Sequence, residues 1–405
     1  MKDNILLPNL EGQECTGCCI CSAVCPTKAI NIELSKDGFY EPKVNDELCI
    51  NCSFCKKCCY KYDQNILEDE KEQYLCYSAI NKDDNELKSS TSGGVSIELM
   101  KKCIKNGYKV VGVTYDYEQD IAVTKITSEI SELETFKGSK YFQSYTVSAF
   151  EEVIKDNSNQ RYAIFGTPCQ IYALSRYSEV RKNREKFLLV DIFCHGCPSI
   201  NLWKKYLESK KKELKVDKFD KIEFRSKSYG WHEYSNTFYK NNNKYYSQRI
   251  NDPFYELFFD KNIFNKACYE CKVRSSFKYT DIRIGDFWGV HYDRNSTGVS
   301  GVVLVSNRGK DLFKSIKDNF TTEEYEFEEI VKAQSYKKVH KLNNALRNET
   351  LEMLSSDMKL DKIIKDYRSK YSVNKRIKIK GKNVLKMLPR NIYLNLKFIV
   401  HKVGK

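Results

Sequence analysis

The chain has 405 residues and a net charge of +14, and its 41% of hydrophobic residues exclude global disorder. Its length exceeds one compact core, so two or three units are expected, and the lack of an apolar run of about 20 residues excludes an integral membrane protein. Its 17 cysteines are odd in number and its start lacks the signal-peptide pattern, which excludes a small secreted disulfide scaffold and favours a reduced, cytoplasmic protein with thiolate-bound metal.

Two cysteine runs of the same spacing occupy residues 15–59. The first reads CxxCxxCxxxCP and the second CxxCxxCxxxC, a spacing typical of bacterial ferredoxins with two [4Fe-4S] clusters, in which each run lends its fourth thiolate to the other cluster. We therefore assign one cluster to Cys15, Cys18, Cys21 and Cys59, and the second to Cys49, Cys52, Cys55 and Cys25. A pair of zinc sites is the alternative, but zinc ribbons use two CxxC knuckles.

The other residues of this ferredoxin domain, 1–62, have no expected ligand role. Cys19 and Cys58 are expected to be small buried side chains, and Tyr60 stands where a second proline would be expected. The segment 26–42 between the runs predicts a hairpin.

After a polar, acidic linker at 63–88, strand-like and helix-like segments alternate. This alternation predicts a mixed α/β or α+β core. Expected strands are 109–115, 121–126, 162–165, 187–193, 222–225, 281–287 and 302–306, with a turn inside 231–247. Expected helices begin near 95, 171, 200 and 307.

Four cysteines of the core lie at turns, namely Cys169, Cys194, Cys268 and Cys271. The first two directly follow strands, at the sheet edge where open α/β folds bind ligands, and the last two form a CxxC pair. Four converging thiolates bind one metal centre. The spacing alone does not decide for such a centre, because cysteine is also a common buried residue, and a mononuclear zinc would use the same ligands.

Seven motifs occur in an order that resembles the beta subunit family of coenzyme F420-reducing hydrogenases and dehydrogenases. They are TSGGVSIEL, KGSKYFQS, FGTPCQIYAL, FCHGCPS, FRSKSYGW, CYECKVRSSFKYTDIRIGDFWG and STGVS. The resemblance implies an N-terminal family part at 89–165 and a C-terminal part at 166–345. It also implies an FAD and a third [4Fe-4S] cluster, held by the four core cysteines named above. Cys197 stands where the family more often has an aliphatic residue, and we treat it as a neighbour of the ligands.

The resemblance also points to residues that bind FAD, since no GxGxxG fingerprint follows a strand. A diphosphate is bound well by backbone N–H groups at a helix N-terminus. The candidates are Ser92, Gly93 and Gly94 before a helix, Gly138, Ser139, Lys140 and Tyr141 in a turn, and Ser300 after Gly298. Asp286 is a further cofactor-binding candidate, or a structural residue that packs with Trp288 under the isoalloxazine ring.

A histidine next to the cluster ligands is the candidate catalytic residue. His195 has the pKa range of a proton donor, although a neutral histidine that bonds a cluster sulfur or the backbone fits equally. Arg225, Lys227, Trp231 and His232 are expected either to shape a substrate mouth or to be ordinary strand residues.

Together these features predict an oxidoreductase. Electrons would arrive singly from reduced ferredoxin or a similar donor and leave FAD in pairs toward an organic substrate. The alternatives are an electron-transfer subunit that feeds a partner enzyme, and a structural zinc protein. Coenzyme F420 is the namesake substrate, but Ser226 replaces the usual acidic residue, so family association favours a sugar or lipid-linked intermediate of surface polysaccharide synthesis.

The positive charge belongs to the end of the chain, where 346–405 is expected to be a basic helical tail. Residues 361–405 contain fourteen Lys and Arg against two Asp, a net +12 of the total +14. In 375–405 basic and apolar residues interleave as in helices that lie on an anionic membrane, which would place the protein at the inner face of the membrane. Docking of an acidic ferredoxin and a plain solvated end are the alternatives. Nucleic-acid binding is not expected, because no known motif accompanies the charge.

Overall fold

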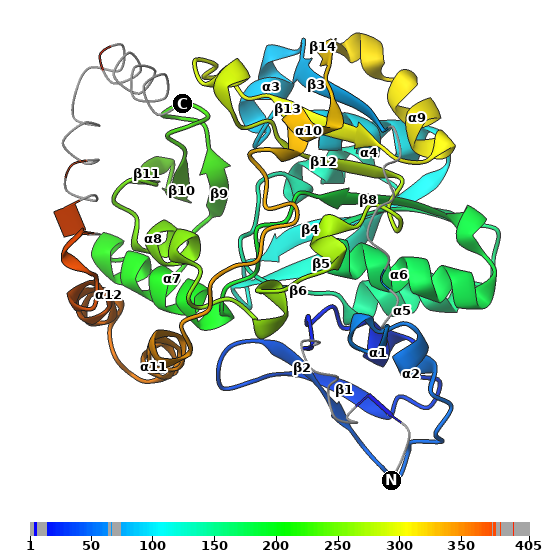
Figure 1. Cartoon of the computed structure of the whole chain (residues 1–405), viewed down its shortest axis with the longest axis horizontal. Coiled ribbons are helices and arrows are strands. Elements are labelled where there is room, and N and C mark those ends of the chain that lie inside the picture. The colour runs from blue at the N-terminus through cyan, green and yellow to red at the C-terminus, as the bar shows by residue number, and fades with distance from the viewer. Residues whose placement is uncertain are drawn as a thin grey trace.

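The computed structural model describes residues 4–5, 14–63, 66, 74–374, 376–377, 381 and 392. Figure 1 shows a small N-terminal module, a broad central sheet with helices on both faces, and a lobe built from a small sheet and several helices. The mixed α/β architecture expected from the sequence is confirmed.

The N-terminal module carries the two cysteine runs on short helices. α1 (Ile20–Ala23) and α2 (Phe54–Lys57) each lie inside one run, and β1 (Ile30–Leu34) pairs antiparallel with β2 (Tyr40–Val44). The hairpin expected between the runs is therefore confirmed. Cys19 and Cys58 are buried, as expected for cysteines outside the ligand pattern.

The central sheet has the strand order β14-β3-β13-β12-β8-β7-β4-β5-β6. The bounds are β3 (Leu75–Asn81), β4 (Tyr108–Asp116), β5 (Ile121–Thr127), β6 (Ser144–Tyr145), β7 (Arg161–Gly166), β8 (Phe187–Ile192), β12 (Ile282–Asp286), β13 (Ser300–Leu304) and β14 (Phe320–Glu324). Neighbours β4, β7, β8 and β12 run parallel, so their carboxyl ends share one edge. The two family parts expected on either side of residue 165 contribute to this one sheet.

Helices cover both faces of the sheet. One face is covered by α4 (Val95–Lys105) and α9 (Asn307–Lys314), and the other by α5 (Val147–Lys155) and α6 (Pro168–Arg181). Ile20 of the N-terminal module shares an apolar cluster with α5 and α6. The module is therefore anchored on these two helices (Figure 1).

Part of the expected linker is a strand of the central sheet instead. β3 pairs with β13 and β14, and its Cys76 and Ala79 are buried. α3 (Asp84–Ser89) follows, capped by the Asp83 carboxylate. The prediction of a linker over 63–88 is wrong for this stretch. The strand LCYSAIN is short and lies between acidic, polar segments, so its mostly buried residues do not stand out in the sequence.

A three-stranded antiparallel sheet and helices form the lobe, and α10 packs on the central sheet. The strands are β9 (Lys221–Ser226), β10 (Ser235–Lys240) and β11 (Asn243–Gln248), and the helices are α7 (Ile200–Leu214), α8 (Pro253–Asp260), α11 (Asn344–Ser355) and α12 (Leu360–Ser369), with α10 (Phe327–Val331) on the sheet. Leu351, Leu354 and Ile363 are buried in the same core as Trp203. The expected tail therefore begins after α12 and not at 346. Most of the tail lies outside the described residues.

A buried ion pair joins two central strands. Arg283 of β12 donates from Nε to Asp191 Oδ1 at 2.7 Å and from Nη2 to Asp191 Oδ2 at 2.5 Å, and Asp191 lies on β8. Both side chains are at most 2% exposed. Arg283 also donates to the carbonyl oxygens of Arg274 and Ser276, so the pair fixes the loop that follows the CxxC cysteines.

We expect Asp191→Asn to lower the free energy of unfolding by about 3–5 kcal/mol, because it leaves the Arg283 charge buried without a counter-charge. The measurement is the urea unfolding midpoint of the anaerobically purified protein. The control is Glu118→Gln, which breaks the exposed pair with Lys218 and is expected to cost less than about 1 kcal/mol. Equal midpoints for the two variants would contradict a central role for the buried pair.

Candidate functional site

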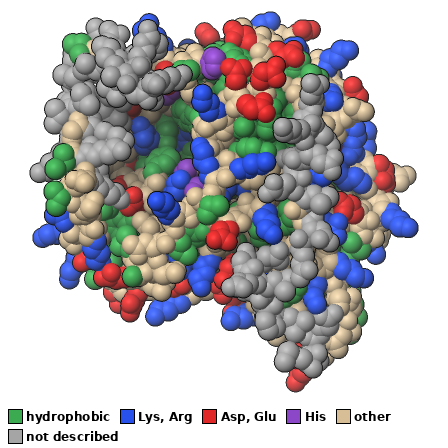
Figure 2. Space-filling model, in the orientation of Figure 1, with side chains coloured by type: hydrophobic (Ala, Val, Ile, Leu, Met, Phe, Trp, Pro, Cys, Tyr) green, Lys and Arg blue, Asp and Glu red, His purple; other side chains and the backbone are tan. Residues whose placement is uncertain are grey.

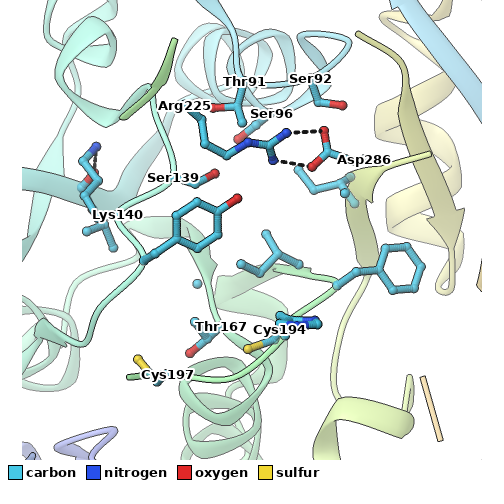
Figure 3. Close-up of a pocket in the computed structure, with 18 of the residues that line it drawn as sticks. Thr91, Ser92, Ser96, Ser139, Lys140, Thr167, Cys194, Cys197, Arg225 and Asp286 are labelled. Carbon is cyan, nitrogen blue, oxygen red and sulfur yellow. Dashed lines mark hydrogen bonds and ion pairs between the residues drawn. The ribbon is translucent and has the colours of Figure 1, made fainter. Parts of the chain in front are cut away.

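A large cavity lies between the carboxyl ends of β7 and β8, the start of α4 and the lobe. Its volume is about 770 Å³, within the range of small-molecule and cofactor sites. Figure 2 shows the hollow between lobe and sheet, with Lys, Arg and His side chains around it. Figure 3 shows the hydroxyl-bearing Thr91, Ser92 and Ser96 at one end and Cys194 and Cys197 at the other.

Nearly all the core residues expected to form a site line this one cavity. They are Ser92, Gly94, Gly138, Ser139, Lys140, Tyr141, Cys169, Cys194, His195, Cys268, Cys271, Asp286 and Ser300. Gly93 lies just behind the wall, where its N–H is donated to Ser300 Oγ at 3.0 Å.

Five cysteines converge on the sulfur end of the cavity. Cys169 lies in the first turn of α6, Cys194 and Cys197 follow β8, and Cys268 and Cys271 come from the CxxC loop; all five are free thiols. Burial raises the pKa of Cys194 to about 11 and raises the pKa of the other four thiols as well. Among the described residues, no three or more His, Cys, Asp or Glu side chains are grouped to hold a single metal ion.

Local turns determine where these thiols lie. Thr167 and Gln170 form a capping box, and Pro168 occupies the first turn, so α6 begins next to Cys169. Thr167 Oγ1 lies 3.2 Å from Cys169 Sγ. The Asn265 N–H donates to the Cys197 carbonyl at 2.8 Å, which joins the loop after β8 to the CxxC loop.

The N-terminal module lies against this sulfur end. Cys18 lines the cavity beside the core cysteines. The pKa of Cys169 is raised first by burial and next by the nearby Cys18. Cys15, Cys18, Cys21 and Cys59, the first expected ligand set, line a second cavity of about 30 Å³. In the other expected set, Cys55 lies near Cys52 and Cys25, which contribute to its raised pKa.

Several hydrogen bonds join the module to the core, and three of them involve residues in or next to the cysteine runs. The Thr146 hydroxyl donates to the Cys18 carbonyl at 2.9 Å, and Gln143 Nε2 donates to the Thr16 carbonyl at 3.0 Å. The Lys272 N–H donates to the Tyr60 hydroxyl at 3.2 Å. Tyr60 directly follows Cys59 of the module, and Lys272 directly follows Cys271 of the core. The bond therefore joins the neighbours of two expected ligand cysteines.

Two of the expected flavin segments meet at the hydroxyl end. Ser92 Oγ donates to the Val299 carbonyl at 2.8 Å, beside the bond between Gly93 and Ser300. Gly94 adopts a left-handed φ of +86° as N-cap of α4, a conformation that favours glycine. The Ser-Gly-Gly segment thus aims the N-terminus of α4 toward the cavity.

Lys140 does not offer its ammonium group to the cavity. Its Nζ donates to the carbonyl oxygens of Val113, Thr135, Phe136 and Lys137 at 2.9–3.3 Å, and Figure 3 shows it directed away from the cavity centre. Burial lowers its pKa to about 7. The expectation of a phosphate donor at Lys140 is therefore corrected: the side chain holds the cavity wall together, while Ser139 presents its hydroxyl to the cavity.

Asp286 is also engaged within the protein. Its carboxylate accepts hydrogen bonds from Arg225 Nη1 at 2.5 Å (Figure 3) and from Trp231 Nε1 at 2.7 Å. The Trp231 and Trp288 rings stack with centroids 4.5 Å apart. Arg225 is buried with φ +55°, and its guanidinium lies 4.3 Å from the Tyr234 ring centre. Arg225 and Asp286 thus form a rigid, paired wall instead of a free acid beside a ring.

His195 occupies the wall next to Cys194. Its Nδ1 lies 2.7 Å from Ser335 Oγ, and its Nε2 is a buried atom without a hydrogen-bond partner among the described residues. Burial lowers its pKa to about 3, with the nearby cation Lys261 acting in the same direction. The imidazole is therefore neutral near pH 7, which matches the hydrogen-bonding alternative better than a proton donor.

Other lining residues were not expected from the sequence. Thr91 and Ser96 lie on either side of the Ser-Gly-Gly segment. Their hydroxyl groups at the start of a predicted helix could have indicated that they line a binding site. Thr167 was detectable as part of a capping-box pattern. Arg274 had no signal beyond a single basic residue after a CxxC pair.

Comparison with known proteins finds a family model that matches part of this core. Residues 159–330 match the model for the C terminus of the coenzyme F420 hydrogenase/dehydrogenase beta subunit. The resemblance expected from the motifs is therefore confirmed over these residues, and the matched family is, by its description, one of oxidoreductase subunits.

A solved structure provides a more distant comparison. A chain of the F420-reducing [NiFe] hydrogenase complex from Methanosarcina barkeri aligns with 18% identity and a TM-score of 0.45, covering 76% of this chain and 97% of that chain. No curated protein matches the sequence significantly. In the part of the chain that the structure describes, no helix is long and apolar enough to cross a membrane.

We expect Lys140→Met to lower the free energy of unfolding by about 1–3 kcal/mol, because four carbonyl oxygens lose their donor. The urea unfolding midpoint measures the change. Lys109→Met is the matched control, since Lys109 is 38% exposed and reaches only Glu152 at 3.9 Å. If both variants unfold at the same midpoint, Lys140 does not support the cavity wall.

Proposed function

We propose that the chain is an iron–sulfur flavoprotein oxidoreductase with two clusters in the N-terminal module, a third in the core, and FAD in the large cavity. It takes single electrons from a ferredoxin-like donor and transfers two to an organic substrate. The observation that carries this proposal is the order of the three cysteine sets, which lead from the surface to the cavity wall.

The outermost set includes Cys52, which is exposed, whereas Cys18 of the next set is buried and lines the large cavity. The Tyr60 hydroxyl, one residue after Cys59, then meets the backbone beside Cys271. Since the two N-terminal sets also share one apolar cluster, each set adjoins the next. Such an arrangement suits stepwise transfer of single electrons between clusters.

The core cysteines fit a cluster. Four irons each need one outside thiolate, and the cavity presents five free thiols from three separate turns. Because burial raises their pKa, binding of iron must displace thiol protons, as metal binding to cysteine generally does. Cys169, Cys194, Cys268 and Cys271 would hold the cluster, with Cys197 as a close neighbour.

The opposite end of the cavity fits FAD. The N-terminus of the eleven-residue helix α4 faces it, and the hydroxyl groups of Ser92, Ser96 and Ser139 line it. These donors suit a diphosphate. FAD, when bound, exchanges single electrons on one side for electron pairs on the other.

The remaining wall would hold the substrate. Arg225 and Asp286 fix its shape, and His232 and Arg249 also line it. The substrates to assay first are those implied by family resemblance, namely sugar or lipid-linked intermediates of surface polysaccharide and oxidised coenzyme F420.

Anaerobic purification with iron, sulfide and flavin quantitation tests the proposal. We expect about twelve irons and one FAD per chain, at four irons per cluster. About eight irons without flavin would reject the core cofactors. Flavin that is reduced by donor but not reoxidised by any substrate would instead indicate an electron-transfer subunit that feeds a partner enzyme.

Cysteine variants test the ligand assignment. We expect Cys169→Ala and Cys268→Ala each to lose about four irons, and Cys197→Ser to keep the full number. Cys197 is the matched control because it lines the same cavity and is buried like the others. Loss of iron from Cys197→Ser with retention in Cys268→Ala would overturn the assignment.

A further inference from the structure

Arg274 is a buried cation beside the core cysteines. The residue is 4% exposed, and its Nη1 donates to the Cys268 carbonyl at 3.0 Å while its Nη2 donates to the Lys338 carbonyl at 2.5 Å. Nη1 also lies 2.9 Å from Nε2 of His340, whose pKa burial lowers to about 4. All these partners are neutral near pH 7.

The Arg274 charge has no carboxylate within ion-pair distance in the described part of the chain. Its Nε makes no hydrogen bond there either. The two other buried arginines at the site differ, since Arg283 pairs with Asp191 and Arg225 pairs with Asp286. An uncompensated buried charge is strongly unfavourable, so this position calls for an anion.

The neighbouring charges do not supply that anion. Lys261 and Lys338 lie close enough for their charges, with that of Arg274, to act on His340 and His195. Arg274 instead adjoins the core thiols. It lines the same cavity as Cys194, Cys268 and Cys271, its Nη1 contacts the Cys268 carbonyl, and its charge acts on all three thiols.

We propose that Arg274 supplies the charge that balances the thiolates of the core [4Fe-4S] centre and thereby raises its reduction potential. The inference rests on the proposed function, because it requires a cluster on the core cysteines. A thiolate-bound cluster is anionic and gains negative charge on reduction, so a fixed cation favours the reduced state. A raised potential makes the core centre a better electron acceptor than it would be without Arg274, which favours electron transfer toward the cavity.

The test is a redox titration followed by electron paramagnetic resonance on wild type, Arg274→Gln and Arg274→Lys. The signal of the core centre is the one that disappears in Cys169→Ala. For Arg274→Gln we expect its potential to fall by about 59 mV or more, which is a tenfold change in a one-electron equilibrium constant. Arg274→Lys keeps the charge and is expected to stay near the wild-type potential.

Two controls separate charge from general damage. The N-terminal clusters report in the same sample and should keep their potentials in both variants. Arg347→Gln removes another buried arginine, 3% exposed, which donates to the Phe264 carbonyl and is not among the main charges that act on the core thiols. Its core potential should match that of wild type.

An unchanged core potential in an iron-replete Arg274→Gln overturns the inference. If that variant loses the core cluster, Arg274→Lys decides: a wild-type potential supports the role of charge, and a lowered potential overturns it. A wild type with only about eight irons is a different result, because it rejects the proposed core cluster itself.

Discussion

The buried ion pair between Arg283 and Asp191 is the interaction on which the site geometry depends. It locks β12 beside β8, three residues before Cys194, and through the Arg274 and Ser276 carbonyls it holds the loop after the CxxC cysteines. Together with the bond from the Asn265 N–H to the Cys197 carbonyl, it anchors the thiols that follow β8 to those of the CxxC loop. The Arg283 charge is tolerated in the interior because all three guanidinium nitrogens donate hydrogen bonds, either to Asp191 or to a backbone carbonyl.

The same ion pair illustrates why the core strands can be predicted from the sequence more easily than the core site. Strand segments such as FLLVDIF and DIRIGDF read as strands because apolar residues dominate them, and both prove to be neighbouring strands of the sheet. The pattern does not reveal that Arg283 and Asp191 face each other. Pairing of strands far apart in sequence is a tertiary property, and local periodicity carries no information on it.

Other failures have equally local causes. β3 was hidden because its neighbours in sequence are acidic and polar, although it is inserted between β13 and β14. α11 and α12 were assigned to a basic tail because their exposed faces are charged, while Leu351 and Ile363 are buried. The cysteine sets were predictable by contrast, since ligand spacing is a local property of the chain. Lys140 shows the limit at the site: its residue type suits a phosphate, but four nearby carbonyls accept its protons first.

Protonation couples the core cysteines to their surroundings. With the thiols protonated, as burial favours, the sulfur end of the cavity contains the cation Arg274, which has no carboxylate partner among the described residues. Under the proposed function, metal binding would deprotonate the thiols and the same charges would become favourable. Assembly of the proposed core cluster would therefore change the electrostatic balance of the loops after β8 and around the CxxC pair from unfavourable to favourable. Because Lys272 and Tyr60 connect this loop to the N-terminal module, a filled core site would also stabilise the contact between the two cysteine-bearing parts of the chain.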